Sequence, residues 1–253
     1  MDKYISLRDK NNKMSLLLPT KTVWTFTLLL LVLLATIVIS AGIGEIYISP
    51  FEVIKVILGQ STSQKELVIK SFRLPRIIVA LLVGSSLSVS GTILQGIIRN
   101  PLASPNIIGI TGGASVGAIT FLTLFSAKDL SHSLTVSLSW LPLAAFLGAA
   151  LVAVLVYTLA WKDGVSPLRL VLVGIGLGAA SKALTTVLII LSPVYLASQA
   201  MLWLTGSIYA TSWQDVFSLL PWFIILLPLS LIFARDLNVQ ILGDEVAQGV
   251  GSY

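Results

Sequence analysis

A glycine-rich stretch in the first half of the sequence could, by its residue types, hold a nucleophilic serine. Residues 113–117 read Gly-Ala-Ser-Val-Gly and match the G-x-S-x-G pattern of serine hydrolases, with Ser115 in the nucleophile position. That chemistry needs a strand-to-helix turn and triad partners. The only histidine, His132, lies in the loop after the apolar run that contains Ser115. A hydrolase is therefore disfavoured, and the stretch is interpreted as the start of an apolar helix.

Other catalytic and metal-binding patterns find no better support in the sequence. A phosphate-binding loop would read G-x-x-x-x-G-K-[ST], and the chain has no such run, which predicts no ATPase site of its own. Metal binding is poorly supported because the chain has one histidine and no cysteine, and its carboxylates are dispersed over loops. Asp244 and Glu245 are adjacent, but neighbours on a helix point to different sides. We expect no enzyme activity, no metal and no cofactor.

The composition is typical of a membrane protein. The chain is 56% hydrophobic and only 11% charged, with a mean hydropathy of +0.95, whereas soluble domains carry about 25% charged residues. A helix needs about 20 apolar residues to cross the hydrocarbon core. The sequence therefore predicts an all-α polytopic membrane protein with six transmembrane helices and additional short interfacial helices. The predicted spans are 23–43, 77–98, 107–125, 137–161, 168–191 and 216–234.

The charged residues predict the orientation of these spans. Residues 1–22 form a basic N-terminus, residues 23–234 the transmembrane domain, and residues 235–253 a final amphipathic segment. The first apolar run exceeds the roughly 7–15 residues of a signal-peptide core, which favours an uncleaved anchor. Lysine and arginine are most concentrated before this span, and such a bias predicts a cytoplasmic N-terminus. Short amphipathic or interfacial helices are expected at residues 49–59 and 195–213.

Small residues recur every four positions within three of the predicted spans. A spacing of four is close to one helical turn, so each series lines one helix face and lets a neighbouring backbone approach closely. These faces predict tight helix packing. The glycines assigned to them are Gly84, Gly96, Gly109, Gly113, Gly117, Gly174 and Gly178.

Lys182 is the one charged residue well inside a predicted span. It lies about 15 Å from the outer end of residues 168–191 at 1.5 Å per residue. An ionisable group at that depth must reach the interface, pair, or face a polar cavity. Both a role in lining a pathway and a structural role remain open. Because the spans hold no acidic residue at mid-depth, ion coupling is poorly supported, and energy from a partner protein is favoured.

Four stretches of the sequence carry a family resemblance. Residues 73–118, which begin RLPRIIVALLVG and contain QGIIRNPLASPNIIGITGGASVGA, are the longest, and residues 170–179, 203–213 and 237–251 follow in the same order. They resemble the FecCD-like transmembrane permeases of ATP-binding-cassette (ABC) importers for iron siderophores, haem and cobalamin. The resemblance spans nearly the whole chain. Family members have about ten membrane helices, so it implies a C-terminally shortened chain with six.

The resemblance implies a multi-pass permease in the bacterial plasma membrane that takes up a ferric siderophore or a related chelate by alternating access. Its implied partners are cytoplasmic ATP-binding subunits, an extracytoplasmic substrate-binding protein and a second permease subunit, in a homodimer or heterodimer, within membrane lipid and without nucleic acid. Arg73 and Arg76 resemble residues that dock the binding protein, although interfacial anchoring is an alternative. The residues implied to couple to the ATPase are Leu237, Asn238, Leu242, Gly243, Asp244, Glu245, Ala247 and Gly251.

Two alternatives to an importer permease remain open at this stage. One is a secondary carrier that works without ATP. The other is a shortened, non-transporting fragment of the permease. The sequence leaves open which siderophore, haem or corrinoid would be carried.

Overall fold

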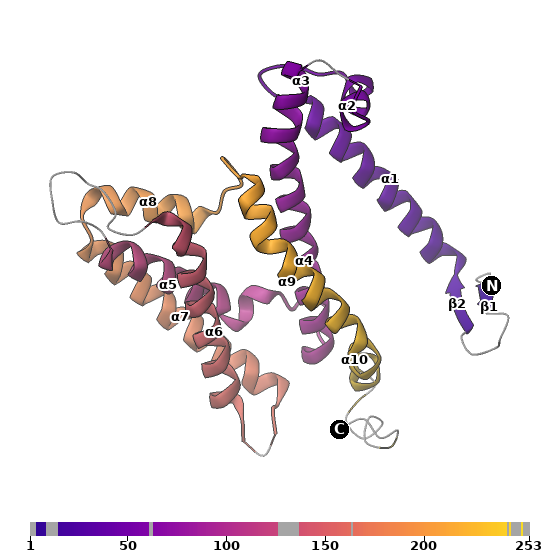
Figure 1. Cartoon of the computed structure of the whole chain (residues 1–253). Helices are drawn as coiled ribbons and strands as arrows, with labels where there is room; N and C mark the ends of the chain where they lie inside the picture. Colours follow the sequence, from indigo (N-terminus) through magenta and orange to yellow (C-terminus); the bar gives the residue numbers. More distant parts are fainter. Residues whose placement is uncertain are drawn as a thin grey trace. The chain divides into compact units, whose positions relative to one another are not determined.

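The computed structural model describes residues 4–8, 15–60, 63–125, 137–162, 164–241, 243 and 249 (Figure 1). Helices dominate these residues, which confirms the predicted helical fold class. The helices that precede α5 are α1 (Thr20–Gly42), α2 (Pro50–Ile57), α3 (Ser63–Leu67), the π-helix η1 (Val68–Arg73), α4 (Leu74–Ile98) and the 3₁₀ turn η2 (Pro105–Ile108). Those that follow are α5 (Ile110–Leu124), the 3₁₀ turn η3 (Leu138–Trp140), α6 (Leu141–Ala160), α7 (Pro167–Leu191), α8 (Val194–Thr205), α9 (Trp213–Ile232) and α10 (Ala234–Ile241).

Five helices in the described ranges are long and apolar enough to cross a membrane. They correspond to five of the six predicted spans, and α9 continues through Pro221 and Pro228. The predicted span 107–125 is shorter than expected: α5 has 15 residues and is about 22 Å long, less than the roughly 30 Å hydrocarbon core. The reason is that Ile107 and Ile108 lie in η2, and Gly109 adopts a left-handed φ of 74° before α5 begins.

A short antiparallel strand pair precedes α1 and was not predicted. β1 (Tyr4–Arg8) pairs with β2 (Ser15–Pro19), with Tyr4 opposite Pro19 and Arg8 opposite Ser15. The pair lies within the basic N-terminal region, before the first apolar helix. It leaves the helical class of the membrane domain unchanged.

The chain divides into two compact units, of which the first comprises residues 1–81 and 209–219. Its core is a cluster of buried aliphatic side chains from α1, α2, η1 and the loop between α1 and α2. α2 begins at Pro50, where the Ser49 side chain accepts a hydrogen bond from the Glu52 amide at 3.3 Å. The buried members of the cluster are Ala41, Ile48, Val53, Val56 and Ile69.

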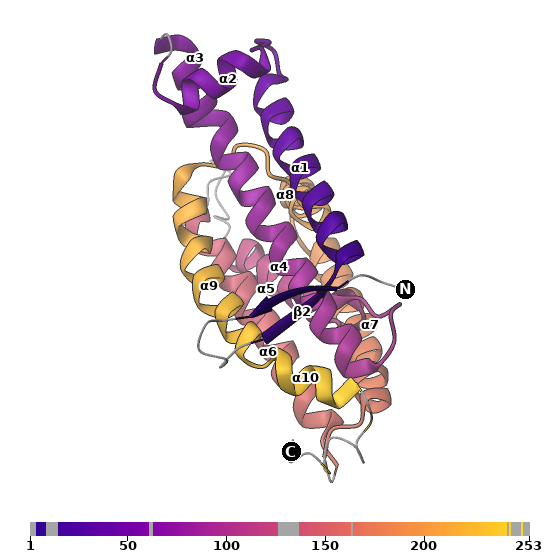
Figure 2. The same ribbon diagram turned by 90° about the vertical axis from the view of Figure 1, so that its right-hand side faces the viewer.

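The second unit comprises residues 82–208 and 220–253. Within it α5 packs against both α6 and α7, and α8 also contacts α5 (Figure 1; Figure 2 gives the view turned by 90°). The core side chains are apolar and come from α5, α6 and α8. The largest of them are Ile119, Phe121, Leu122, Leu141 and Leu196.

Candidate functional site

The Arg73 guanidinium is bonded to the end of α1. Its Nη1 donates to the carbonyl oxygens of Ala41 at 2.7 Å and Gly42 at 3.0 Å, and its Nη2 donates to that of Ile46 at 2.5 Å. The last carbonyls of a helix lack intrahelical partners and carry the negative end of its dipole, so a cation there stabilises the terminus. A Cβ added at Gly44 would lie 2.6 Å from Nη2. Arg73 therefore caps α1.

Arg76, three residues further along, is in a different position. Its guanidinium carbon lies 5.0 Å from the centre of the Tyr209 ring, a cation–π distance. Its Nε is buried and has no hydrogen-bond partner among the residues that the structure describes. A buried arginine donor without an acceptor is uncommon in folded proteins. Within this unit, Arg76 is therefore oriented by an aromatic ring, and its Nε has no acceptor among the described residues.

A π-helical turn lies between α3 and α4. The turn η1 includes Lys70, whose carbonyl oxygen accepts a hydrogen bond from the Trp213 Nε1 at 2.9 Å, while its ammonium pairs with Glu66 at 2.6 Å. π-turns inside α-helices are rare and frequent at functional sites. Because η1 ends at Arg73, this turn sets the direction from which Arg73 reaches α1. Hydropathy alone gives no signal for it.

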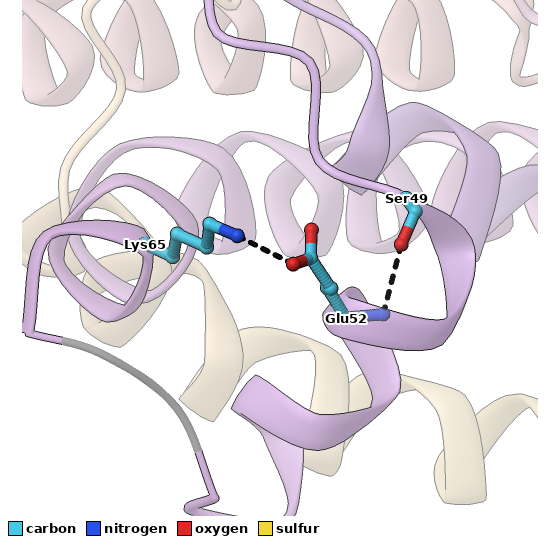
Figure 3. A network of polar contacts seen from close by, with 3 residues as sticks. All are labelled: Ser49, Glu52 and Lys65. Atoms are coloured by element: carbon cyan, nitrogen blue, oxygen red, sulfur yellow. Dashed lines mark hydrogen bonds and ion pairs between the residues drawn. The ribbon is translucent and has the colours of Figure 1, made fainter.

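An ion pair joins α2 to α3 in the same unit (Figure 3). The Lys65 Nζ lies 2.5 Å from the Glu52 Oε1, and the Glu52 amide donates to the Ser49 Oγ. The hydrogen bond from Lys65 is the main cause that lowers the pKa of the Glu52 carboxyl below its ordinary value. Sequence reasoning did not find this pair because 13 residues separate its members.

Backbone contact joins α5 to α6. A Cβ added at Gly113 would lie 2.5 Å from both the Gly148 carbonyl oxygen and the Val152 Cγ2. A Cβ at Gly117 would collide with the Ala144 carbonyl oxygen, and one at Gly148 would lie 3.0 Å from the Gly117 Cα. Gly148 was not among the predicted packing residues, although its type would have allowed it.

A second glycine contact joins the start of α5 to α7. A Cβ at Gly109 would lie 2.7 Å from the Gly174 carbonyl oxygen and the Gly178 amide nitrogen. One at Gly174 would lie 2.8 Å from the Ile108 Cα. Gly84 differs from these residues, because no atom in the described part of the chain lies within 4 Å of a Cβ added there. A packing role for Gly84 stays a prediction.

The helix α10 contacts the C-terminal end of α4. A Cβ at Gly96 would lie 3.0 Å from the Leu237 Cγ, and the Arg99 Nε donates to the Gln240 carbonyl oxygen at 3.0 Å. Asn238 lies within α10, and Gly243 has a φ of 111°. The remaining predicted coupling residues, Leu242, Asp244, Glu245, Ala247 and Gly251, lie outside the described residues.

Lys182 is exposed on α7, next to the buried Ser181. The described ranges offer its ammonium no hydrogen bond or ion pair. Ser181 and Thr185 form the packed face of α7, where Thr185 donates to the Ser181 carbonyl oxygen at 2.8 Å. Lys182 therefore extends from the side of α7 that its own unit leaves open.

Ser115 lies inside α5, where its hydroxyl donates to the Thr111 carbonyl oxygen at 3.0 Å. This geometry belongs to a regular helix, whereas a nucleophile elbow requires a sharp strand-to-helix turn. His132 lies outside the described residues. The arrangement that the structure describes around Ser115 is therefore one of helix packing.

Comparison with known proteins places this arrangement among transport permeases. The FecCD transport family matches residues 30–253. The "Probable siderophore transport system permease protein YfhA" of Bacillus subtilis is 48% identical to this chain. The match covers 92% of this chain and 67% of that protein. The achromobactin transport system permease protein CbrC of Dickeya dadantii is 44% identical over 91% of this chain and 64% of its own. The chain thus spans about two thirds of the length of these relatives.

The solved structures include a similar fold. A chain described as "An inward-facing conformation of a putative metal-chelate type ABC transporter" matches with a TM-score of 0.75 and 31% sequence identity, over 91% of this chain and 68% of that one. Together with the apolar helices, these relatives identify a multi-pass membrane protein.

Proposed function

This chain belongs to the FecCD transport family, and we propose that it is the permease subunit of an ABC importer that takes up a ferric siderophore or a related iron chelate. The observation that carries the proposal is the family match, which runs from α1 to the end of the chain. Relatives named for siderophore, achromobactin and iron-citrate transport support iron chelates as the substrate class.

The proposed orientation has the N-terminus in the cytoplasm. The Arg73–Arg76 region then lies outside, and the turn after α4 and α10 lie inside. The chain carries no phosphate-binding loop, so cytoplasmic ATP-binding subunits supply the energy, and an external binding protein delivers the chelate. A second permease subunit completes the pathway.

The two arginines have different roles in this proposal. Arg76 pairs with a carboxylate of the binding protein, since its guanidinium is oriented by Tyr209 and its half-buried side chain makes no hydrogen bond or ion pair within the described residues. Arginine binds carboxylates with two parallel hydrogen bonds and orients a partner on docking. Arg73 holds the end of α1 through its hydrogen bonds. It affects docking of the binding protein only indirectly, by fixing the position of that helix end.

The segment 237–251 contacts the ATP-binding subunit. Its first five residues lie in α10, which is amphipathic and contacts Gly96 and Arg99 near the end of α4. An amphipathic helix that lies across a membrane face suits docking into a groove of a partner.

Lys182 lines the substrate pathway. It lies about 22 Å from the Pro167 end of α7 and about 13 Å from the Leu191 end. Side chains of a helix lean toward its N-terminus, so Lys182 tilts away from its nearer interface, and reaching the headgroups is disfavoured. An ammonium held at that depth needs a polar environment. A pathway for anionic chelates provides one.

Reconstitution in liposomes tests the proposal. Liposomes that hold the chain together with a cognate ATP-binding subunit and binding protein should take up radioactive ferric chelate. Uptake should require ATP on the side of the membrane where the ATP-binding subunit lies. Uptake that persists without the ATPase and collapses with an ionophore would identify a secondary carrier instead. Failure to co-purify with any ATP-binding subunit would favour a non-transporting fragment.

A further inference from the structure

Lys182 lies beside small side chains on the open side of α7. Ala179, three residues before it, and Thr186, four residues after it, share its side of the helix and are exposed. The Thr186 hydroxyl donates to the Lys182 carbonyl oxygen at 3.0 Å, so the helix itself satisfies this donor. Between Arg169 and the end of α7 at Leu191, Lys182 is the only charged residue. Its ammonium therefore dominates the electrostatics of this side of α7.

The described spans supply no carboxylate to neutralise Lys182. Among the described helices long enough to cross a membrane, the only acidic residues are Glu66 and Asp215. Glu66 lies near one end of its span and pairs with Lys70. Asp215 lies in the first turn of α9, where it accepts hydrogen bonds from Ser212. Since a cation at mid-depth is costly without a counterion, an anion that passes along α7 is favoured there.

The charge of a ferric chelate depends on its ligand groups. Three hydroxamates balance the charge of a ferric ion, so such a chelate is neutral, whereas citrate and catechol groups leave a net negative charge. The family match does not choose between these kinds of cargo. An ammonium does choose, because it attracts an anion and offers a neutral chelate no such attraction.

A lysine also suits a substrate that has to move on. Its ammonium is a compact, hydrated charge on a flexible stem, whereas the guanidinium of arginine holds a carboxylate with two parallel hydrogen bonds. Passage through a pathway requires an attraction strong enough for entry and weak enough for release. One lysine can therefore select a chelate by its charge without trapping it.

We propose that Lys182 makes the pathway selective for ferric chelates of net negative charge over neutral and cationic ones. This inference rests on the proposed function, in which Lys182 lines the pathway. The depth of Lys182 supports the role, because it lies about 22 Å from one end of α7 and about 13 Å from the other. A chelate that moves along α7 therefore has to pass the ammonium. Cationic chelates are repelled there, and neutral ones gain nothing that offsets the loss of water around the charge.

Thiol reagents of opposite charge measure this selectivity, because the chain has no cysteine of its own. Thr186→Cys places a thiol about 5–6 Å from Lys182 on the same side of α7. With the chain in lipid nanodiscs, its rate of reaction is measured with anionic sulfonatoethyl methanethiosulfonate and with cationic trimethylammonioethyl methanethiosulfonate. The ratio of the anionic to the cationic rate should fall about tenfold when Lys182→Gln is added. Lys182→Arg should keep the ratio, because it retains the charge.

Lys162→Gln is the matched control. It removes the same charge from the same unit near the Pro167 end of α7, about 22 Å from Lys182 and well beyond the Debye length of about 8 Å. It should leave the ratio unchanged.

A second measurement uses chelates themselves. At equal ionic strength, ferric citrate should slow the reaction of Thr186→Cys with the anionic reagent more than a neutral ferric trihydroxamate does. Lys182→Gln should abolish this difference, since the attraction for the anionic chelate is lost.

The outcomes separate this inference from the function on which it rests. If Lys182→Gln leaves the ratio unchanged, if Lys162→Gln lowers it equally, or if the two chelates slow the reaction equally, charge selection by Lys182 is wrong. If neither reagent reacts with Thr186→Cys, this side of α7 faces lipid or protein, and both the pathway role and the inference fall. The importer proposal stands in each of these cases, because ATP-dependent uptake by liposomes decides it separately.

Discussion

The Arg73 guanidinium donates to the carbonyl oxygen of Ala41 at 2.7 Å, across 32 residues of sequence. Three residues later, Arg76 has a buried Nε without an acceptor in the described part of the chain. The motif RLPR presents the two arginines as equivalent, and their resemblance to docking residues applies to both. Their contacts differ: Arg73 holds the end of α1, whereas Arg76 packs on the Tyr209 ring and has no acceptor for its Nε in the described residues.

Arg73→Ala should loosen the end of α1. Three hydrogen bonds from a charged donor are lost, and we expect a loss of about 2–3 kcal/mol of local stability. Hydrogen exchange of the amides of residues 41–48 measures this loss of stability. Arg73→Lys should show an intermediate loss, because an ammonium cannot reproduce the forked hydrogen bonds of a guanidinium. Unchanged exchange in Arg73→Ala would mean that these bonds do not hold α1.

Arg76→Ala should leave the hydrogen exchange of α1 unchanged and should lower the affinity of the chain for the binding protein. Loss of one charge-assisted pair corresponds to a Kd about 10–100 times higher, and the difference should shrink at high salt. Biolayer interferometry on the chain in nanodiscs gives the Kd. Lys55→Ala, which removes an exposed charge from α2 of the same unit, is the control. An equal effect of both variants would indicate general charge attraction and no specific pair.

Helix packing shows what residue spacing can and cannot predict. Spacing every four residues assigned Gly113, Gly117 and Gly84 to packing faces, but only the first two lie against a neighbouring backbone in the described residues. Spacing defines a face of a helix and leaves its partner undefined. Gly148 was missed because it stands alone in its span, although it completes the contact with α5.

Other features could not be predicted because their causes lie far away in the sequence. The left-handed Arg99 is accompanied by a bond to Gln240, 141 residues later, and the π-turn η1 by a bond from Trp213 to Lys70, across 143 residues. Five of the six apolar runs found by hydropathy coincide with long apolar helices of the described ranges. Hydropathy could not separate η2 from α5, because Ile107 and Ile108 are as apolar as the helix that follows.

Gly113→Ala should destabilise the contact between α5 and α6. Its Cβ would meet backbone and a branched side chain at 2.5 Å, and such overpacking costs about 1–3 kcal/mol. Gly84→Ala is the matched control, since its Cβ meets no described atom within 4 Å and alanine favours a helix by up to about 1 kcal/mol. Thermal unfolding in detergent measures the effect, and we expect a lower Tm for Gly113→Ala only. A lower Tm for Gly84→Ala would reveal a contact at that position.

Lys182→Cys should react with a membrane-impermeant thiol reagent, whereas Leu184→Cys should not. The two positions differ by about 3 Å in depth and lie on opposite sides of α7, because two residues turn a helix by about 200°. Only a side that faces a water-filled pathway admits a charged reagent. Equal protection of both cysteines would place Lys182 against lipid or protein and remove its pathway role. Lys182→Met should then transport as the wild type does.

The ion pair between Glu52 and Lys65 predicts a pH dependence of the first unit. The pKa of Glu52 is lower in the folded protein than its ordinary value of 4.5, so the pair stabilises the fold above that value. The stabilisation is lost as the pH falls below 4.5 through the folded-state pKa. Glu52→Gln lacks this carboxyl, and its Tm should lie below that of the wild type at pH 7.

The gap in Tm between wild type and Glu52→Gln should close as the solution is acidified below pH 4.5, since protonation of Glu52 removes the same charge that the substitution removes. Both side chains of the pair are more than a third exposed, so the gap should be small and should also narrow in high salt. Lys65→Met tests the cause from the other side, because without the ammonium the carboxyl returns toward its ordinary pKa. A gap that stays constant across this range would show that the ion pair does not tie α2 to α3.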